Sequence, residues 1–301
     1  MTVTNTPSPF AALSQRFLTG LVGRDILASR SPWLHEREAD ALKVRLVYMI
    51  FDFAARAWDE DQLPHLLDAA QTAGFSGLNI THPFKQAVIG HLDDLSDGAR
   101  QIGAVNTVAF QNGRKIGYNT DVTGFAESVR QGLPGVALSK VVQMGAGGAG
   151  SATAHALLDM GVEQLTIFDK DTARLSTLTA KLAHDFGSSR VRSGDDLAIA
   201  VEQADGLVNA TPLGMLNHPG SAIPAALLTP RHWVADIVYF PLETELLRDA
   251  GLRGCRTLDG SGMVVHQAAA AFEIFTGLVA DRNRMLRSFV EFVSGPHSQA
   301  A

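Results

Sequence analysis

Short apolar runs alternate with amphipathic stretches through the first part of the chain. Apolar runs bounded by turn residues predict buried strands, and apolar residues at helical spacing predict helices. Strands are expected at 17–23, 46–51, 77–80 and 105–110, and helices at 32–43, 59–73 and after Pro83. Ser31 and Asp59 are the expected N-caps of the first two helices. Strands and helices in this order predict an α/β unit.

The pair Asn112-Gly113 lies between two strand-like runs and predicts a tight hairpin. The return strand ends near Tyr118, and a helix is expected to begin at about Asp121. A link that contains glycine and proline follows at 132–135. We therefore expect a domain boundary between 118 and 135.

A regular alternation of strands and helices begins at residue 141. Strands are expected at 141–144, 165–168, around 191, at 206–209 and at 234–238, and helices at 152–160, 172–186, 195–202, 243–248, 261–276 and 282–293. Such an alternation predicts a parallel sheet, which binds ligands at the carboxyl ends of its strands. The loops 209–215 and 239–241 are therefore expected to face a ligand.

Composition narrows the class of protein. The chain has 301 residues, 46% of them apolar and 19% charged, which is typical of soluble globular proteins. The net charge of −6 and the lack of a Lys/Arg run argue against a nucleic-acid partner. The lone Cys255 excludes an internal disulfide and fits the cytoplasm. Residues 1–14 lack the apolar core of a signal peptide, and the weakly charged stretch 263–280 contains His266 and Glu273. We therefore expect no membrane span, and no metal site is predicted.

Three glycines follow the strand at 141–144 with the spacing G-x-G-x-x-G. Gly145 permits a tight turn, Gly147 lets the backbone approach a pyrophosphate, and Gly150 lets the helix pack closely on the strand. The N-terminus of the helix offers unpaired N–H groups to phosphates. Asp169 ends the next strand, where a carboxylate would accept hydrogen bonds from the ribose of NAD and repel the 2′-phosphate of NADP. The motif predicts an NAD site, and a βα turn without a ligand is the alternative.

Several polar side chains have both a structural and a functional explanation. Ser29 and Ser31 flank a helix start, where Ser31 would cap the helix and both hydroxyls could also hold a polyhydroxylated ligand. Lys85 is expected on the first turn of a helix, where the dipole disfavours a cation, so its placement needs another reason. Asp121 fits a first-turn acid. Gln267 is either a satisfied core amide or a ligand donor.

Six ordered motifs between about 21 and 286 resemble those of the shikimate dehydrogenase family. They are Ser29 to Pro32, Asn79 to Lys85, Ala104 to Thr107, Asn119 to Gly124, Asn209 to Met215, and Gln267. The resemblance implies that Lys85 and Asp121 are catalytic. It implies substrate binding by Ser29, Ser31, Thr81, Asn106, Tyr239 and Gln267. The residues expected at the cofactor are Gly145, Ala146, Gly147, Gly148, Ala149, Gly150, Asp169, Arg174, Thr211, Pro212, Gly214 and Met215.

The segment 168–171 differs from the basic or hydroxyl set that NADP enzymes of the family usually carry, and is similar to the NAD-dependent quinate/shikimate dehydrogenase branch. The implied reaction is the reversible oxidation of shikimate and/or quinate to the 3-dehydro ketone, with the hydride passing to NAD. Lys85 would relay the proton of the reacting oxygen, and Asp121 would hold the ammonium in position. We expect the oxidation to run best at alkaline pH.

The implied architecture is an α/β fold with a substrate domain at 15–120, a Rossmann NAD-binding domain at 121–260 and a cleft between them. The helices of 261–301 are expected to pack back onto the first domain and bring Gln267 to Lys85 and Asp121. Two other functions stay open, a dehydrogenase for an amino analogue of quinate or shikimate and a catalytically silent NAD-binding regulator. The expected partner is a small-molecule substrate, and assembly as a homodimer stays open.

Overall fold

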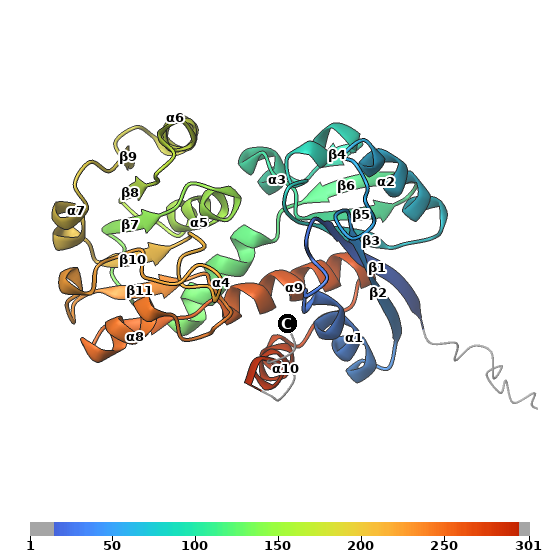
Figure 1. Cartoon of the computed structure of the whole chain (residues 1–301). Helices are drawn as coiled ribbons and strands as arrows, with labels where there is room; N and C mark the ends of the chain where they lie inside the picture. Colours follow the sequence, from blue (N-terminus) through green and yellow to red (C-terminus); the bar gives the residue numbers. More distant parts are fainter. Residues whose placement is uncertain (1–14, 295–301) are drawn as a thin grey trace, which may run out of the picture.

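Two six-stranded sheets divide the chain into two units that lie side by side (Figure 1). The structure, a computed structural model, describes residues 15–294. The predictions made for residues 1–14 and for the last residues of 261–301 lie outside this range. We call residues 16–118 the first unit and residues 140–258 the second unit. Helices α4 (Asp121–Gly132) and α9 (Ser261–Thr276) lie between them.

The first unit combines parallel strands with an antiparallel hairpin. Its elements are β1 (Arg16–Gly23), α1 (Ser31–Ala41), β2 (Arg45–Asp52), α2 (Gln62–Thr72), β3 (Gly77–Ile80), the 3₁₀ helix η1 (Ala87–His91), β4 (Asp94–Leu95), α3 (Asp97–Ile102), β5 (Thr107–Gln111) and β6 (Arg114–Tyr118). The strand order is β2-β1-β3-β5-β6-β4. Asn112 and Gly113 at the hairpin turn both have positive φ, as this tight turn requires. Apolar side chains of α1 and α9 form one core of this unit, and those of α2 and η1 form another.

The second unit is a parallel sheet with helices on both faces. Its elements are β7 (Lys140–Met144), α5 (Gly148–Asp159), β8 (Gln164–Phe168), α6 (Thr172–Phe186), β9 (Val191–Ser193), α7 (Leu197–Gln203), β10 (Gly206–Asn209), the 3₁₀ helix η2 (Ala225–Leu227), β11 (Trp233–Asp236), α8 (Glu245–Leu252) and β12 (Arg256–Leu258). The strand order is β12-β11-β10-β7-β8-β9, and all neighbours are parallel. The carboxyl ends of these strands therefore share one edge of the sheet.

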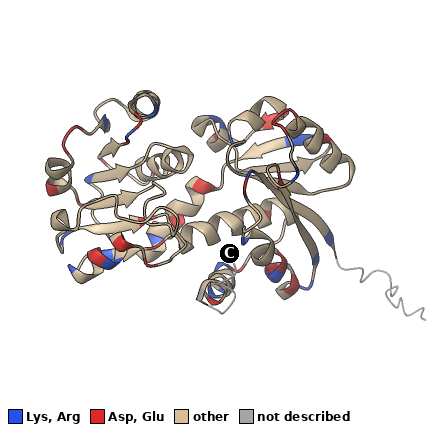
Figure 2. Ribbon diagram, viewed as in Figure 1, with Lys and Arg blue, Asp and Glu red and all other residues tan. Residues whose placement is uncertain are grey.

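Helix α9 connects the first unit with α4. It packs along α4 and also contacts β1, β5 and α1, while α10 (Arg282–Ser294) packs on α9 and α1. The close approach of α4 needs Gly124, because a Cβ there would lie 2.8 Å from the carbonyl oxygen of Met263. Helix α9 carries one acidic residue, Glu273, and is otherwise uncharged in Figure 2. None of the helices within 15–294 has the length and apolar character needed to cross a membrane.

The predicted α/β fold class is confirmed, but two N-caps were wrong. Helix α1 begins at Ser31, so its N-cap residue is Arg30 and not Ser31. The backbone N–H of Ser31 donates to the Oγ of Ser29 (3.3 Å). Helix α2 begins later than predicted, so Asp59 does not cap it. The preceding loop turns back on itself, with Trp58 N donating to the carbonyl of Phe53 (2.9 Å).

The expected helix after Pro83 was also wrong. Lys85 lies in a turn, and η1 begins only at Ala87. The carbonyl of Lys85 accepts a hydrogen bond from Val105 N (2.8 Å), which ties it to the chain before β5 instead of to a helical turn. Similarly, β11 stops short of the predicted end because the Asp236 carboxylate accepts the backbone N–H of Val238 (3.0 Å). The short elements β4, α3, η2 and β12 were not predicted.

Candidate active site

Most of the predicted catalytic and substrate residues lie at one edge of the first sheet. Because β5 runs antiparallel to β3 and β6, its first residue lies beside the last residues of those strands. The segments that follow β1, β3 and β6 therefore meet the segment that precedes β5. These segments carry Ser29, Ser31, Thr81, Lys85, Asn106 and Asp121.

Lys85 and Asp121 form an ion pair at this edge. The Nζ of Lys85 lies 2.6 Å from the Oδ2 of Asp121. The Asp121 side chain is 5% exposed and the Lys85 side chain 24% exposed. Phe84, next to Lys85, is fully buried and anchors the turn that carries the lysine. The pair thus combines a buried carboxylate with an ammonium group that remains accessible from outside.

Asn106 fixes the other oxygen of the Asp121 carboxylate. Its Nδ2 donates to the Oδ1 of Asp121 (2.9 Å) and to the hydroxyl of Thr120 (2.9 Å). Its Oδ1 accepts from Thr120 N (2.8 Å) and from the Thr107 hydroxyl (3.0 Å), which fixes the orientation of the amide. Asn106 is buried and its polar atoms all have protein partners. It therefore positions the carboxylate, a role that the sequence did not predict.

Two residues that were not predicted as site residues, Tyr48 and Asn79, support the serine pair. The hydroxyls of Ser29 and Ser31 lie 3.3 Å apart. Burial raises the pKa of Tyr48 on β2, and a hydrogen bond with the Ser31 side chain opposes this shift. The Tyr48 hydroxyl also donates to the Oδ1 of Asn79 (2.7 Å), whose Nδ2 donates to the carbonyl of Asn106 (3.3 Å). A polar contact path thus joins the serines to the Lys85–Asp121 pair.

Three further predicted substrate residues surround this group. Thr81 continues β3, with its N–H donating to Val22 O (2.9 Å) and its methyl group beside Gly23. The Oε1 of Gln267, on α9, lies 3.5 Å from the Nδ2 of Asn106. Helix α9 therefore brings Gln267 next to the residues of the first unit. Tyr239 belongs to the second unit, where it lies in the loop after β11 and is 44% exposed.

The glycine turn after β7 has the geometry that a dinucleotide requires. Gly145 has φ +104°, and a Cβ there would lie 2.6 Å from the carbonyl oxygen of Ala210. A Cβ at Gly150 would collide with the carbonyl oxygen of Gly145, whereas one at Gly147 or Gly148 would meet no atom within 4 Å. The first and third positions thus need glycine for packing, and the middle of the turn leaves open space at the N-terminus of α5 where phosphates fit.

Gln143, which was not predicted as a site residue, fixes the conformation of this turn. Its Nε2 donates to the carbonyls of Gly145 and Gly150 (2.8 Å each), and its Oε1 accepts from the Thr153 hydroxyl (2.9 Å). The side chain is fully buried. A single amide in an otherwise apolar strand was the signal that could have identified it.

Asp169 lies at the glycine turn. Its Oδ2 accepts from Ala146 N (2.7 Å), and its Oδ1 accepts from Asp171 N (2.8 Å). The carboxylate thus ends β8 beside the first residues of the turn, where the ribose of a bound dinucleotide would meet it. Arg174, on α6, is half-exposed and pairs with Asp171 at 3.3 Å.

The loop after β10 rests on a buried polar group. The Nδ2 of Asn209 donates to the Oδ1 of Asp236 (2.9 Å), and the Oδ1 of Asn209 accepts from the hydroxyl of Thr211 (2.7 Å). The Thr244 hydroxyl donates to the Oδ2 of Asp236 (2.7 Å). Burial raises the pKa of Asp236 to about 6, against the opposing effect of these hydrogen bonds. This group fixes the start of the predicted cofactor loop, which continues through Pro212, Gly214 and Met215.

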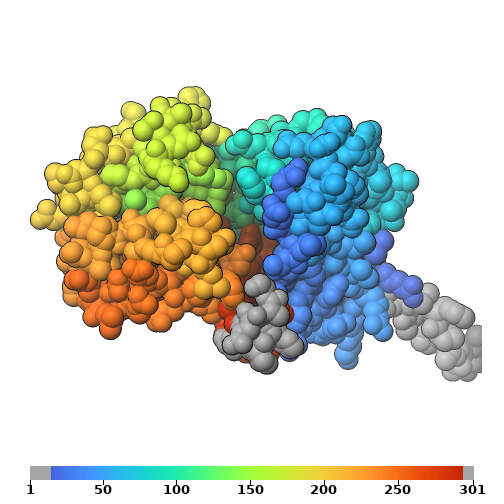
Figure 3. Space-filling view, in the orientation of Figure 1, coloured from blue at the N-terminus to red at the C-terminus, as the bar shows by residue number. Residues whose placement is uncertain are grey.

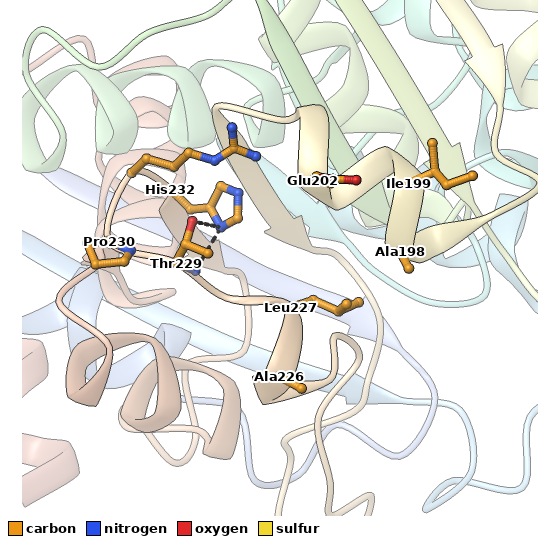
Figure 4. Close-up of a pocket in the computed structure, with 9 residues that line it drawn as sticks. Ala198, Ile199, Glu202, Ala226, Leu227, Thr229, Pro230 and His232 are labelled. Carbon is orange, nitrogen blue, oxygen red and sulfur yellow. Dashed lines mark hydrogen bonds between the residues drawn. The ribbon is translucent and has the colours of Figure 1, made fainter.

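A crevice separates the two units on the face seen in Figure 3. It is distinct from a surface cavity of about 620 Å³ in the second unit, lined by α7, η2 and the loop before β11. Figure 4 shows His232 in that cavity, hydrogen-bonded to Thr229. Because the loop precedes β11, the cavity lies at the amino ends of the strands, away from the glycine turn. The crevice, not this cavity, is therefore the candidate site.

Comparisons with known proteins agree with the crevice as the candidate site. The profile of the shikimate dehydrogenase substrate binding domain matches residues 21–108, and that of the shikimate 5′-dehydrogenase C-terminal domain matches residues 260–288. The ThiF family profile matches residues 118–194. The substrate-binding-domain profile covers the segments that carry both serines, Lys85 and Asn106, and the C-terminal-domain profile covers Gln267.

Whole-chain relatives carry two kinds of name. A shikimate dehydrogenase (NADP⁺) from Arthrobacter sp. is 49% identical over 93% of this chain and 97% of its own. A quinate/shikimate dehydrogenase (NAD⁺) from Corynebacterium efficiens is 50% identical over 91% of this chain and 97% of its own. Among solved structures, quinate dehydrogenase from Corynebacterium glutamicum in complex with NAD superposes with a TM-score of 0.88 at 46% identity, covering 92% of this chain and 99% of that one.

Proposed function

The chain belongs to the shikimate dehydrogenase family, which confirms the resemblance seen in the sequence, and we propose that it is an NAD-dependent oxidoreductase that reversibly oxidises quinate and/or shikimate to the 3-dehydro ketone. The observation that carries this proposal is the Lys85–Asp121 ion pair of 2.6 Å at the edge of the first sheet. An ammonium held by a buried carboxylate can hydrogen-bond the oxygen of an alcohol and take up or return its proton.

Lys85 is the proposed general acid–base residue. In oxidation its neutral amine accepts the hydroxyl proton of the substrate, and in reduction its ammonium returns a proton to the oxygen. Asp121 holds the Nζ in place, and Asn106 keeps the carboxylate oriented because its Nδ2 donates to the Oδ1 of Asp121. NAD, when bound, supplies the hydride acceptor. Because the amine must be unprotonated for oxidation, the forward rate is expected to rise toward alkaline pH.

Asp169 supports NAD as the cofactor. Sequence identity alone does not select it, because relatives named for NADP⁺ and for NAD⁺ match this chain equally well. The Asp169 carboxylate, hydrogen-bonded to Ala146 N, places a negative charge at the end of β8. A ribose with free hydroxyls would bind there, whereas a 2′-phosphate would meet like charge. Gly145 to Gly150 would hold the pyrophosphate, with Arg174 and the loop from Thr211 to Met215 beside the cofactor.

The remaining site residues are proposed to hold the polyhydroxylated ring. Ser29, Ser31, Thr81 and Gln267 offer hydroxyl and amide groups on the first-unit side of the crevice, and Tyr239 offers a phenol from the second unit. We propose that residues 15–120 form the substrate domain, completed by the helices from 261 onward, and that 121–260 form the NAD domain. Location in the cytoplasm and assembly as a homodimer stay predictions.

A substrate panel tests the proposal. The purified protein would be given quinate, shikimate or an amino analogue of either, each with NAD and with NADP, while the absorbance of the reduced nicotinamide is followed. We expect turnover of quinate or shikimate with NAD, and higher kcat/KM than with NADP. Turnover of only the amino analogue would replace the substrate assignment. Binding of NAD without turnover of any panel member would instead identify a silent regulator and contradict the proposed activity.

A further inference from the structure

Arg30 is a cation at the site for which the reaction as proposed has no role. It lies between Ser29 and Ser31, as the N-cap residue of α1. Within residues 15–294 it forms no ion pair, whereas Arg37 on the same helix pairs with Glu291 (3.3 Å). A half-buried guanidinium without a carboxylate partner has lost part of its hydration without gaining a counter-charge.

Aromatic side chains of α10 contact both Arg30 and Tyr239 of the second unit. Its guanidinium carbon lies 4.5 Å from the ring centroid of Phe292 on α10, a cation–π contact. Tyr239 approaches from the second unit, with its ring 6.1 Å from that of Phe289 on α10. Burial raises the pKa of Tyr239, and the positive charge of Arg30 opposes that shift. Arg30 thus lies where the two units meet.

A second basic residue near this edge is bound elsewhere. The Nη2 of Arg24 donates to the carbonyl of Trp58 (3.4 Å), which draws it toward the loop after β2. Lys85 is neutralised by Asp121. Within residues 15–294, Arg30 is therefore a positive charge next to the serine pair that has neither a carboxylate partner nor a carbonyl that draws it away, in a chain whose net charge of −6 would otherwise repel anions.

We propose that Arg30 is a specificity-determining residue that binds the carboxylate of the substrate. The inference rests on the proposed function, because quinate and shikimate are carboxylate anions with several hydroxyl groups. A guanidinium matches the planar geometry of a carboxylate, and its stacking on Phe292 leaves its N–H groups free to donate in the plane. The flanking hydroxyls of Ser29 and Ser31 supply neutral donors to the same group. Selection of acids over neutral polyols thus comes from Arg30, and catalysis comes from Lys85 and Asp121.

The test compares acid and neutral substrates. The wild-type protein, Arg30→Gln, Arg30→Lys and Arg37→Gln would be assayed with the substrate acid and with its carboxamide, which keeps the ring and hydroxyls. Arg30→Gln should lower kcat/KM for the acid by about 10- to 100-fold, mainly through KM, and change it for the carboxamide by less than about 3-fold, as expected when one hydrogen bond to a charged group is lost. Arg30→Lys keeps the charge and should retain the preference for the acid.

Arg37→Gln is the matched control. It removes a cation of α1 that, like Arg30, contacts both an aromatic ring and α10. The guanidinium of Arg37 lies 5.0 Å from the ring centroid of Trp33, and its Nε donates to the Ser288 hydroxyl on α10 (3.2 Å). It should leave both substrates within about 2-fold of wild type. Equal losses with acid and carboxamide, or no loss in Arg30→Gln, would overturn the inference while leaving the proposed function intact. A wild-type protein that oxidises neither quinate nor shikimate would refute the proposed function itself, and the role of Arg30 with it.

Discussion

Replacement of Asp236 by asparagine should remove a pH-dependent loss of stability in the second unit. Asp236 is 2% exposed, and burial raises its pKa from 3.8 to about 6. A carboxyl group whose folded pKa is raised contributes its stability fully below the unfolded pKa, and this contribution is lost as the pH rises through the folded pKa. The pH window is therefore about 4 to 6, and stability falls as the pH rises through it.

The size of the effect follows from the shift. A rise of about 2 pKa units at about 1.4 kcal/mol each corresponds to roughly 3 kcal/mol of unfolding free energy. In Asp236→Asn the side-chain oxygen can still accept from Asn209 and from Val238 N, and the new amide can donate to the Thr244 hydroxyl. The variant carries no charge at any pH. Its stability relative to wild type should therefore increase by about 3 kcal/mol between pH 4 and pH 7.

Urea unfolding across this pH range measures the difference directly. Tryptophan fluorescence is a suitable probe because Trp233 lies on β11 together with Asp236 and is buried. Comparison of variant with wild type at each pH cancels the titration of every other group. A stability difference that stays constant from pH 4 to pH 7 would refute the raised pKa, whatever the sign of the constant offset.

Two further predictions concern the cofactor site. Asp169→Ser combined with Lys170→Arg should move the preference from NAD toward NADP by about two decades in the ratio of kcat/KM values. The reason is that one like-charge pair at about 4 Å costs about 4 kcal/mol before solvent screening. Equal use of both cofactors by the unmodified protein would show that Asp169 does not face the ribose. Gly150→Ala should destabilise the NAD-free protein by about 1–3 kcal/mol, because the new Cβ meets the Gly145 backbone. The control Gly148→Ala places its Cβ in open space on the same helix and should leave the melting temperature of the protein unchanged or slightly higher. Similar melting temperatures for both variants would contradict the packing role of Gly150.

The sequence predicted the second unit better than the first. Strictly alternating strands and helices leave few alternatives, and the turn from Gly145 to Gly150 has the packing that its spacing indicates. The turn at Lys85 was missed because its cause is long-range. A hydrogen bond from Val105 N holds the Lys85 carbonyl, and no local pattern encodes that contact. At the start of α1 the contact that was missed is local, because Ser31 N donates to the Oγ of Ser29, two residues earlier.

The supporting residues of the site were the hardest to predict. Asn106 could be named from a motif, but its bonds to Thr120 and Asp121 depend on the pairing of β5 with β6. Asp236 and Gln143 are polar residues within apolar strands, which is a visible signal. Their partners come from other segments, so sequence alone could not tell a functional amide or acid from a buried one that is merely satisfied.

The role of Lys85 is the central claim, and the turnover of Lys85→Ala tests it most directly. At saturating NAD and substrate we predict that kcat falls by about 10² to 10⁴-fold while NAD affinity changes little, and that Lys85→Arg does not restore it. Lys115→Ala is the matched control, because Lys115 forms another lysine–aspartate pair of the first unit, with Asp68, and its removal should leave kcat unchanged. A fall in kcat of less than threefold in Lys85→Ala would contradict the assignment of Lys85 as the proton-transfer residue.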